Sequence, residues 1–137
     1  MRVLALDLGS KRIGVAVSDW LGITVNPVET IHRSGAEFER IKTLVKELEP
    51  QEVVIGLPLR LDNTVGDAAK GALAFAERLR TEIDIPVFTQ DEKLTSAEAE
   101  QMMIERGFDR RRRKAMSDQF AAMIILQDYL SNSTKKN

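Results

Sequence analysis

Hydrophobic positions follow two different periods along the chain, and the shorter period marks the strands. Five segments have the composition of strands: residues 2–8, 13–19, 25–31, 52–57 and 85–90. The first is apolar on both alternating faces, which is typical of a strand buried from two sides. Turn residues 9–12 join it to the second segment and predict a hairpin. Pro27 places the third segment at the edge of a sheet or weakens it as a strand.

The longer period, with apolar residues three and four positions apart, predicts four helices. They cover residues 36–49, about 64–82, 95 to Gly107, and 116–130. Thr95 and Glu98 have the spacing of a capping box, and Gly107 is typical of a helix end. Residues 131–137 are polar and predict a flexible, frayed tail.

The order of these elements predicts an α/β domain of three layers. Three strands come first, followed by helix, strand, helix, strand and two helices, so an antiparallel group of strands 1–3 is joined through crossovers to parallel strands 4–5. The chain has 137 residues, the usual length of one domain, so we expect a single domain over residues 1–137.

Composition narrows the chemistry that the chain can perform. There is no cysteine and His32 is the single histidine, which excludes disulfides, thiolate metal sites and a His-rich zinc site. Any metal must therefore bind oxygen. The longest apolar run, residues 120–126, is far shorter than the roughly 20 residues that a membrane span needs, and no signal-peptide pattern is present. We expect a cytoplasmic protein without a membrane span.

The formal net charge is only −1, so global charge does not indicate a polyanionic partner. Five consecutive cations nevertheless follow Arg106: Arg110, Arg111, Arg112, Arg113 and Lys114. Such a run can contact nucleic-acid phosphates. It is equally compatible with a solvated loop or the start of a helix.

Asp7 is the most unusual residue of the chain, because it lies inside an apolar strand on the face of Val3 and Ala5. Burying an unpaired carboxylate costs several kcal/mol, so a compensating interaction is expected. Asp7 could instead accept amide hydrogen bonds from the turn at Ser10 or Lys11.

Two further acidic positions could join Asp7. Asp91 and Glu92 follow a predicted strand at its carboxyl end, where α/β sheets present their sites, and only one of two adjacent acids is expected to face such a site. Asp118 precedes Ala121 and Ala122 at helical spacing, which places it on the inward face of the last helix. The alternatives are a turn for the first pair and a favourable interaction with the helix dipole for Asp118.

If Asp7, Glu92 and Asp118 converge, they form a histidine-free set of oxygen ligands, with Asp91 a less favoured member. Magnesium prefers such ligands, and two ions can activate water and stabilise the leaving oxygen of a phosphodiester.

Four motifs resemble the YqgF (RuvX) family, and they follow the order and spacing of that family between residues 2 and about 130. They are Asp7-Leu8-Gly9-Ser10-Lys11-Arg12-Ile13-Gly14-Val15-Ala16-Val17-Ser18-Asp19, Gly56-Leu57-Pro58, Asp91-Glu92-Lys93-Leu94-Thr95-Ser96 and Asp118-Gln119-Phe120-Ala121-Ala122. Lys93 and Ser96 stand where the family often has Arg and Thr, and Asp62-Asn63 replaces a more usual Asp-Gly. Lys93 keeps the charge but lacks the bidentate fork of Arg.

The resemblance implies a ribonuclease H-like fold with a mixed five-stranded sheet and helices on both faces. It also implies a nuclease that matures the 5′ end of pre-16S ribosomal RNA, with Asp7, Glu92 and Asp118 as catalytic ligands of two Mg²⁺ or Mn²⁺ ions. Lys11, Arg12, Lys93 and the basic run are the expected nucleic-acid contacts, and RNA is favoured over branched DNA.

Three other functions remain compatible with the sequence. The same fold and acids would serve Holliday-junction resolution, for which a symmetric homodimer is expected, whereas ribosomal RNA processing allows a monomer. The Asp-x-Gly hairpin also resembles the phosphate loop of actin-like ATPases and sugar kinases, which need a second domain. The third alternative is a non-catalytic RNA-binding assembly factor.

Overall fold

The structure, a computed structural model, describes residues 1–59, 66–92 and 95–135. Its elements are β1 (Val3–Leu8), β2 (Arg12–Ser18), β3 (Val25–His32), α1 (Glu37–Leu48), β4 (Glu52–Pro58), α2 (Asp67–Glu82), β5 (Val87–Glu92), α3 (Thr95–Glu105) and α4 (Arg110–Lys135). The five predicted strands and four predicted helices are all present. The predicted start of α2 at Thr64, the residues Lys93, Asp62 and Asn63, and the capping side chain of Thr95 lie outside what the structure describes.

The strands form one mixed sheet in the order β3-β2-β1-β4-β5. β1 pairs antiparallel with β2, β2 pairs antiparallel with β3, and the pairs β1–β4 and β4–β5 are parallel. Both the predicted hairpin and the mixed five-stranded sheet are thus confirmed, and Pro27 lies in the edge strand β3.

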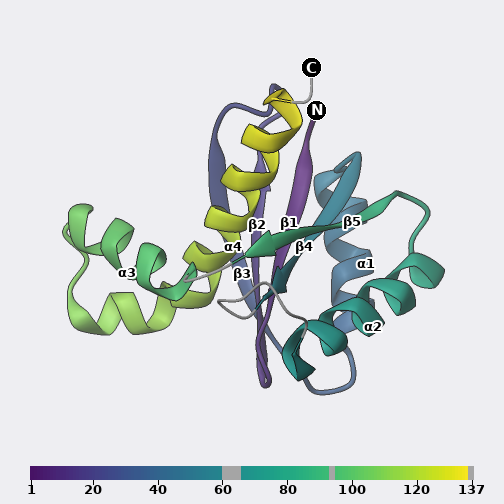
Figure 1. The fold of residues 1–137 in the computed structure, drawn as a ribbon, viewed down its shortest axis with the longest axis horizontal. Coiled ribbons are helices and arrows are strands. Elements are labelled where there is room, and N and C mark those ends of the chain that lie inside the picture. Colours follow the sequence, from purple (N-terminus) through teal and green to yellow (C-terminus); the bar gives the residue numbers. More distant parts are fainter. Residues whose placement is uncertain (60–65, 93–94, 136–137) are drawn as a thin grey trace.

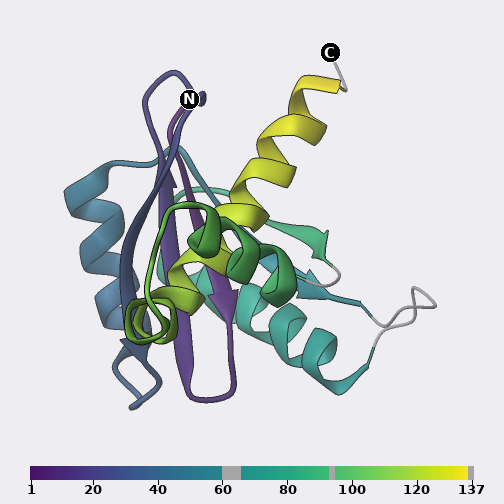
Figure 2. The same ribbon diagram turned by 90° about the vertical axis from the view of Figure 1, so that its left-hand side faces the viewer.

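Helices cover both faces of this sheet, as predicted. Helices α1 and α2 pack on one face and α4 crosses the other, while α3 packs against α4 beside the sheet (Figures 1 and 2). The side chains of β1 alternate between the two layers: Leu4 and Leu6 enter the core beneath α1 and α2, and Val3 and Ala5 enter the core beneath α4. None of the helices in the described part of the chain is long and apolar enough to cross a membrane.

Helix α4 is longer than predicted at both ends. It begins at Arg110 rather than at 116, so the basic run forms its first turns. The apolar period begins only where the helix meets the sheet and therefore misses this exposed start. Asp109 stabilises the start, since its Oδ1 accepts a hydrogen bond of 2.8 Å from the backbone N–H of Arg112. At the other end the helix includes residues 131–135 of the expected tail.

Strand β5 also ends later than predicted, at Glu92 rather than at 90. Asp91 and Glu92 therefore belong to the strand itself and do not follow it. Because successive side chains of a strand point to opposite faces, the two acids are directed to different sides of the sheet.

Candidate active site

Asp7 lies near the carboxyl end of β1, on the face that α4 covers. It pairs across the hairpin with Gly14 of β2. On its other side Leu6 pairs with Ile55 of β4, so the next residue of β4, Gly56, lies beside Asp7. The carboxylate is thus flanked by two residues without side chains, which leaves space above it.

Helix α4 occupies the space above Gly14. A Cβ atom at this position would overlap the backbone carbonyl of Asp118, so the helix backbone rests directly on the strand. Gly56 has a similar role, because a Cβ atom there would overlap the side chain of Ile125. The two glycines therefore set the depth at which α4 packs, and with it the position of Asp118 relative to Asp7.

Asp118 forms an ion pair with Arg12 from the start of β2. The Nε atom of Arg12 donates a hydrogen bond of 2.9 Å to Oδ2 of Asp118. The side chain of Arg12 is 51% exposed and that of Asp118 is 24% exposed, so the pair lies at the rim of the site and remains open to solvent.

Asp7 is affected by both its burial and its neighbour. Burial in the first place, and the negative charge of Asp118 in the second, raise the pKa of Asp7 to about 6. The repulsion between Asp7 at the end of β1 and Asp118 in α4 lowers the stability of the folded protein. A bound cation would remove that repulsion, and such pairs are typical of functional sites.

Glu92 is buried, whereas Asp91 is exposed. The Cγ atom of Glu92 would lie 3.8 Å from a Cβ atom at Gly56, so this side chain extends over β4 on the same face as Asp7. The geometry thus favours Glu92 over Asp91 as the third carboxylate.

The donor set fits a hard divalent cation in its chemistry, because Asp7, Asp118 and Glu92 offer only oxygen ligands on one face of the sheet. Over residues 1–59, 66–92 and 95–135, however, no three acidic or histidine side chains are gathered closely enough to hold a metal ion. The structure thus brings Asp7 and Asp118 together as a pair and places Glu92 on the same face, toward β4.

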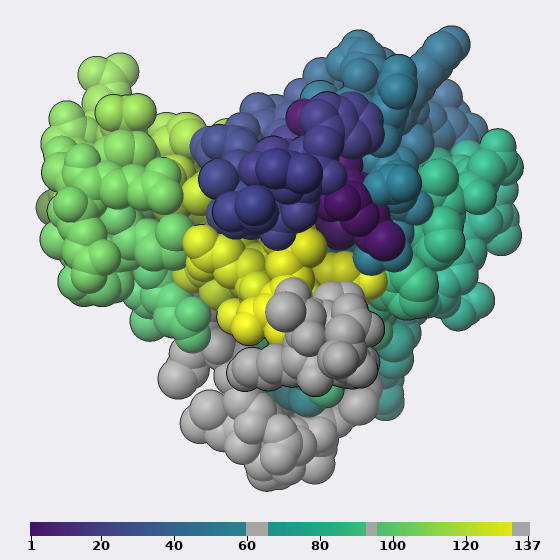
Figure 3. All heavy atoms as spheres, turned by 90° about the horizontal axis from the view of Figure 1, so that it is seen from above, coloured from purple at the N-terminus to yellow at the C-terminus, as the bar shows by residue number. Residues whose placement is uncertain are grey.

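The basic residues divide into several groups. Lys11 and Arg12 are exposed at the β1–β2 turn, beside the carboxylate pair. The basic run lies farther out, where α3 and the first turns of α4 form an arm that projects from the side of the molecule (Figure 3). His32 is exposed at the end of β3, where it pairs across the sheet with Arg12.

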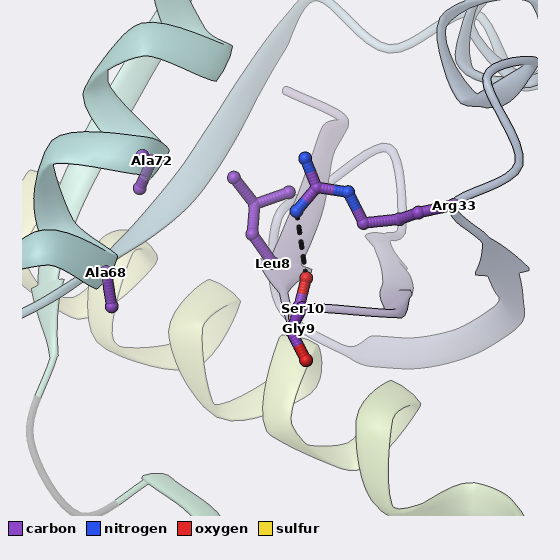
Figure 4. Close-up of a pocket in the computed structure, with 7 residues that line it drawn as sticks. Leu8, Gly9, Ser10, Arg33, Ala68 and Ala72 are labelled. Atoms are coloured by element: carbon purple, nitrogen blue, oxygen red, sulfur yellow. Dashed lines mark hydrogen bonds between the residues drawn. The ribbon is translucent and has the colours of Figure 1, made fainter.

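A hollow of about 200 Å³ lies at the same end of β1 but on the side of α2. The residues that line it are Leu8, Gly9, Ser10, Arg33, Ala68, Gly71 and Ala72. Arg33 extends across it, and its Nη1 atom donates a hydrogen bond of 2.9 Å to the carbonyl oxygen of Gly9 (Figure 4). None of the three candidate carboxylates lines this hollow.

Sequence reasoning missed the two glycines that build the site. The available signal was a glycine inside an otherwise apolar strand, which often marks a close approach of another backbone. Gly14 and Gly56 both fit that description.

Known proteins are similar to this chain in sequence or in fold. The model of the RuvX family, described as Holliday junction resolvase, matches residues 1–132. A protein of Listeria monocytogenes serotype 4b (strain CLIP80459), named "Putative pre-16S rRNA nuclease", is 44% identical over 137 residues, which covers 97% of this chain and 99% of the relative. A relative with the same name from Lactococcus lactis subsp. lactis (strain IL1403) is 43% identical over 133 residues, covering 94% and 93%.

Two solved structures have the same fold at low sequence identity. Thermus thermophilus RuvC in complex with a Holliday junction has a TM-score of 0.63 and 17% identity, covering 98% of this chain and 97% of RuvC. Fowlpox virus resolvase, also bound to junction DNA, has a TM-score of 0.61 and 10% identity, covering 97% and 99%. These likenesses confirm the predicted ribonuclease H-like fold.

The predicted enzyme class is confirmed as well, since the family is described as a resolvase and the relatives are named as nucleases, and both are hydrolases that act on phosphodiester bonds. The motif around Asp7, the fold and the match over nearly the whole chain agree, and the chain belongs to the RuvX (YqgF) family.

Proposed function

We propose that this protein is a metal-dependent nuclease that cleaves RNA phosphodiester bonds in the cytoplasm and processes the 5′ end of pre-16S ribosomal RNA. The observation that carries the proposal is the pair of Asp7 and Asp118, which the backbone contact at Gly14 holds in mutual repulsion. The names of relatives more than 40% identical to this chain support the RNA substrate.

Asp7, Asp118 and Glu92 would hold one or two Mg²⁺ or Mn²⁺ ions. Bound there, the ions would supply an activated water molecule and stabilise the charge that develops on the leaving oxygen. The sheet fixes Asp7 and Glu92, and the packing of α4 fixes Asp118, so two of the three ligands come from rigid strands.

Arg12 has a separate role in this scheme. Its guanidinium group lies on the solvent side of Asp118 and is half exposed, which suits it to neutralise a phosphate of the substrate strand at the rim of the site.

The deciding experiment compares wild-type protein with Asp7→Asn on an RNA that carries a precursor 16S 5′ end. Each protein is incubated with Mg²⁺ or with a chelator, and products are separated on a denaturing gel. We expect cleavage by the wild type with Mg²⁺ only, and none by the variant. Equal cleavage by both proteins would contradict the role of Asp7, and cleavage in chelator would contradict the role of the metal.

Resolution of Holliday junctions is the second candidate, and the description of the matching family favours it. A four-way DNA junction in the same assay tests this alternative. Two symmetric cuts require two sites, so junction resolution also predicts a homodimer in solution mass measurements. RNA cleavage by a monomer that leaves the junction intact would exclude this alternative.

A further inference from the structure

The basic run of α4 is not uniform, because some of its side chains are engaged within the arm and others are not. Arg113 donates a hydrogen bond of 2.8 Å from Nε to Glu100 of α3 and another of 2.8 Å from Nη1 to the carbonyl oxygen of Phe108. The guanidinium of Arg112 stacks 3.8 Å from the ring centroid of Phe108. Both arginines therefore fasten the start of α4 to α3 and to Phe108 in the preceding turn.

Arg106, which precedes the run, is engaged in the same way. Its guanidinium lies 5.0 Å from the ring centroid of Phe120, which is itself almost fully buried and contacts Phe108 edge to face. Such cation–π contacts contribute about 0.5–1 kcal/mol each at exposed sites.

The other cations, Arg110, Arg111 and Lys114, are all exposed. Within the described part of the chain, their side chains make no ion pair, hydrogen bond or ring contact. Three neighbouring positive charges without an internal partner are available to an external anion.

Helical geometry shows where these cations lie relative to Asp118 around the axis of α4. At about 100° per residue, Arg111 and Lys114 lie about 20° and 40° from Asp118 around the helix axis. They precede Asp118 by about two turns and one turn. Arg112 and Arg113 lie about 120° and 140° away from it, where they contact Phe108 and Glu100 of α3.

We infer that Arg111 and Lys114, with Arg110 beside them, contact successive phosphates of the substrate strand along the first turns of α4. The strand then reaches Arg12 and the carboxylate pair at the sheet. This inference rests on the proposed nuclease function and adds a path for the RNA. Arg112 and Arg113 are positioning residues of the arm and do not contact the substrate.

The test compares two double variants that each remove two positive charges from the first turns of α4. Arg111→Gln with Lys114→Gln removes the proposed contacts, and Arg112→Gln with Arg113→Gln is the matched control. Binding to a labelled precursor 16S 5′-end RNA is measured by fluorescence anisotropy in chelator over a series of salt concentrations, so that no cleavage occurs.

For single-stranded nucleic acid the slope of log affinity against log salt falls by about 0.7 for each lost contact, so we expect the first double variant to reduce the slope by about 1.4. The control should keep the wild-type slope while its melting temperature decreases, because only the arm loses contacts. Arg111→Lys should keep the wild-type slope, since the charge is retained. Equal slope changes in the two double variants, or no change in the first, would overturn the inference.

The two proposals can fail separately. RNA cleavage with an unchanged slope in the first variant would remove the path but leave the nuclease function. The expected difference in slopes without any metal-dependent cleavage would keep the path and remove the function.

Discussion

The two faces of the sheet are built from side chains of different size. Beneath α1 and α2 the central strands present large apolar residues such as Leu6, Ile13 and Ile55, all fully buried. Beneath α4 the next residues of the same three strands are Asp7, Gly14 and Gly56. One face is filled by side chains, whereas the other is filled by a helix that comes close to the strand backbone.

Because of this difference, alternate residues of a single strand contribute either to the stability of the fold or to the candidate active site. A residue on the first face contributes mainly buried apolar area, and its neighbour along the chain positions a carboxylate. Adjacent positions of β1, such as Leu6 and Asp7, should therefore respond to substitution in different measurements.

Leu6→Ala should give the largest loss of stability. Leu6 is fully buried between the sheet and the helices α1 and α2. Truncation of such a side chain costs about 2–5 kcal/mol of unfolding free energy. Urea denaturation measures this loss, and the cleavage rate per folded molecule should remain at the wild-type level. A folded Leu6→Ala protein without activity would show that the two faces are not separable.

Gly14→Ala should disturb the other face. The new Cβ atom meets the backbone of Asp118, which cannot rotate away, so α4 must shift. We expect the free energy of unfolding to decrease by about 3 kcal/mol, which is the upper end of the usual cost of overpacking. Cleavage activity should be lost as well.

The matched control for this variant is Gly71→Ala in α2, where an added Cβ atom has no neighbour within 4 Å. That change should stabilise the protein by about 0.5–1 kcal/mol, because alanine favours the helix. A Gly14→Ala protein as stable and active as the wild type would contradict the close contact of α4.

Much of the fold could be predicted because its signals are local. The two-sided apolar pattern of β1 and the turn that follows it are sufficient to predict the hairpin. The start of α4 could not be predicted, since residues 110–115 carry no apolar period, and their helix depends on Asp109 and on contacts with Phe108 and α3. An apolar period reports burial and is absent from a helix that leaves the sheet.

The candidate site was predictable in its residues but not in its contacts. Asp7 stands out by its charge in an apolar strand, whereas the ion pair between Arg12 and Asp118 joins residues 106 positions apart. No local pattern encodes such a contact. The sequence likewise does not show which arginines of the basic run have a partner within the protein, because the residue type is the same at each position.

Asp7→Asn should stabilise the metal-free protein. The pKa of Asp7 in the folded protein is raised to about 6, above the value of 3.8 for an unperturbed aspartate, so folding favours the protonated carboxyl group. Stability is unaffected below pH 3.8, decreases as the pH rises from 3.8 to about 6, and levels off above 6, where Asp7 is ionised in both states. At pH 8 the variant should be more stable by at most about 3 kcal/mol, and by less after allowance for solvent screening.

Thermal denaturation between pH 5 and pH 8 measures this gain, which should increase up to about pH 6 and then level off. Added Mg²⁺ should raise the melting temperature of the wild type and not that of the variant, since only the wild type binds the ion. Asp91, which is exposed and precedes Glu92 in β5, provides the control, because Asp91→Asn should show neither effect. A wild type more stable than Asp7→Asn at pH 8 without metal would contradict the repulsion between Asp7 and Asp118.

Arg12→Gln should have the smallest effect, and it tests whether the arginine and a cation compete for Asp118. The ion pair is half exposed, and pairs of this kind contribute about 0.2–1 kcal/mol, so its loss should increase the affinity for Mn²⁺ by at most about fivefold. The affinity is measured by the electron paramagnetic resonance signal of free Mn²⁺ without nucleic acid. Lys11→Gln removes the same charge from the same exposed turn without breaking the pair. Equal changes in the two variants would mean that Arg12 affects metal binding only through its positive charge. A larger change in Arg12→Gln would show that its hydrogen bond to Asp118 competes directly with the metal for the same oxygen atom.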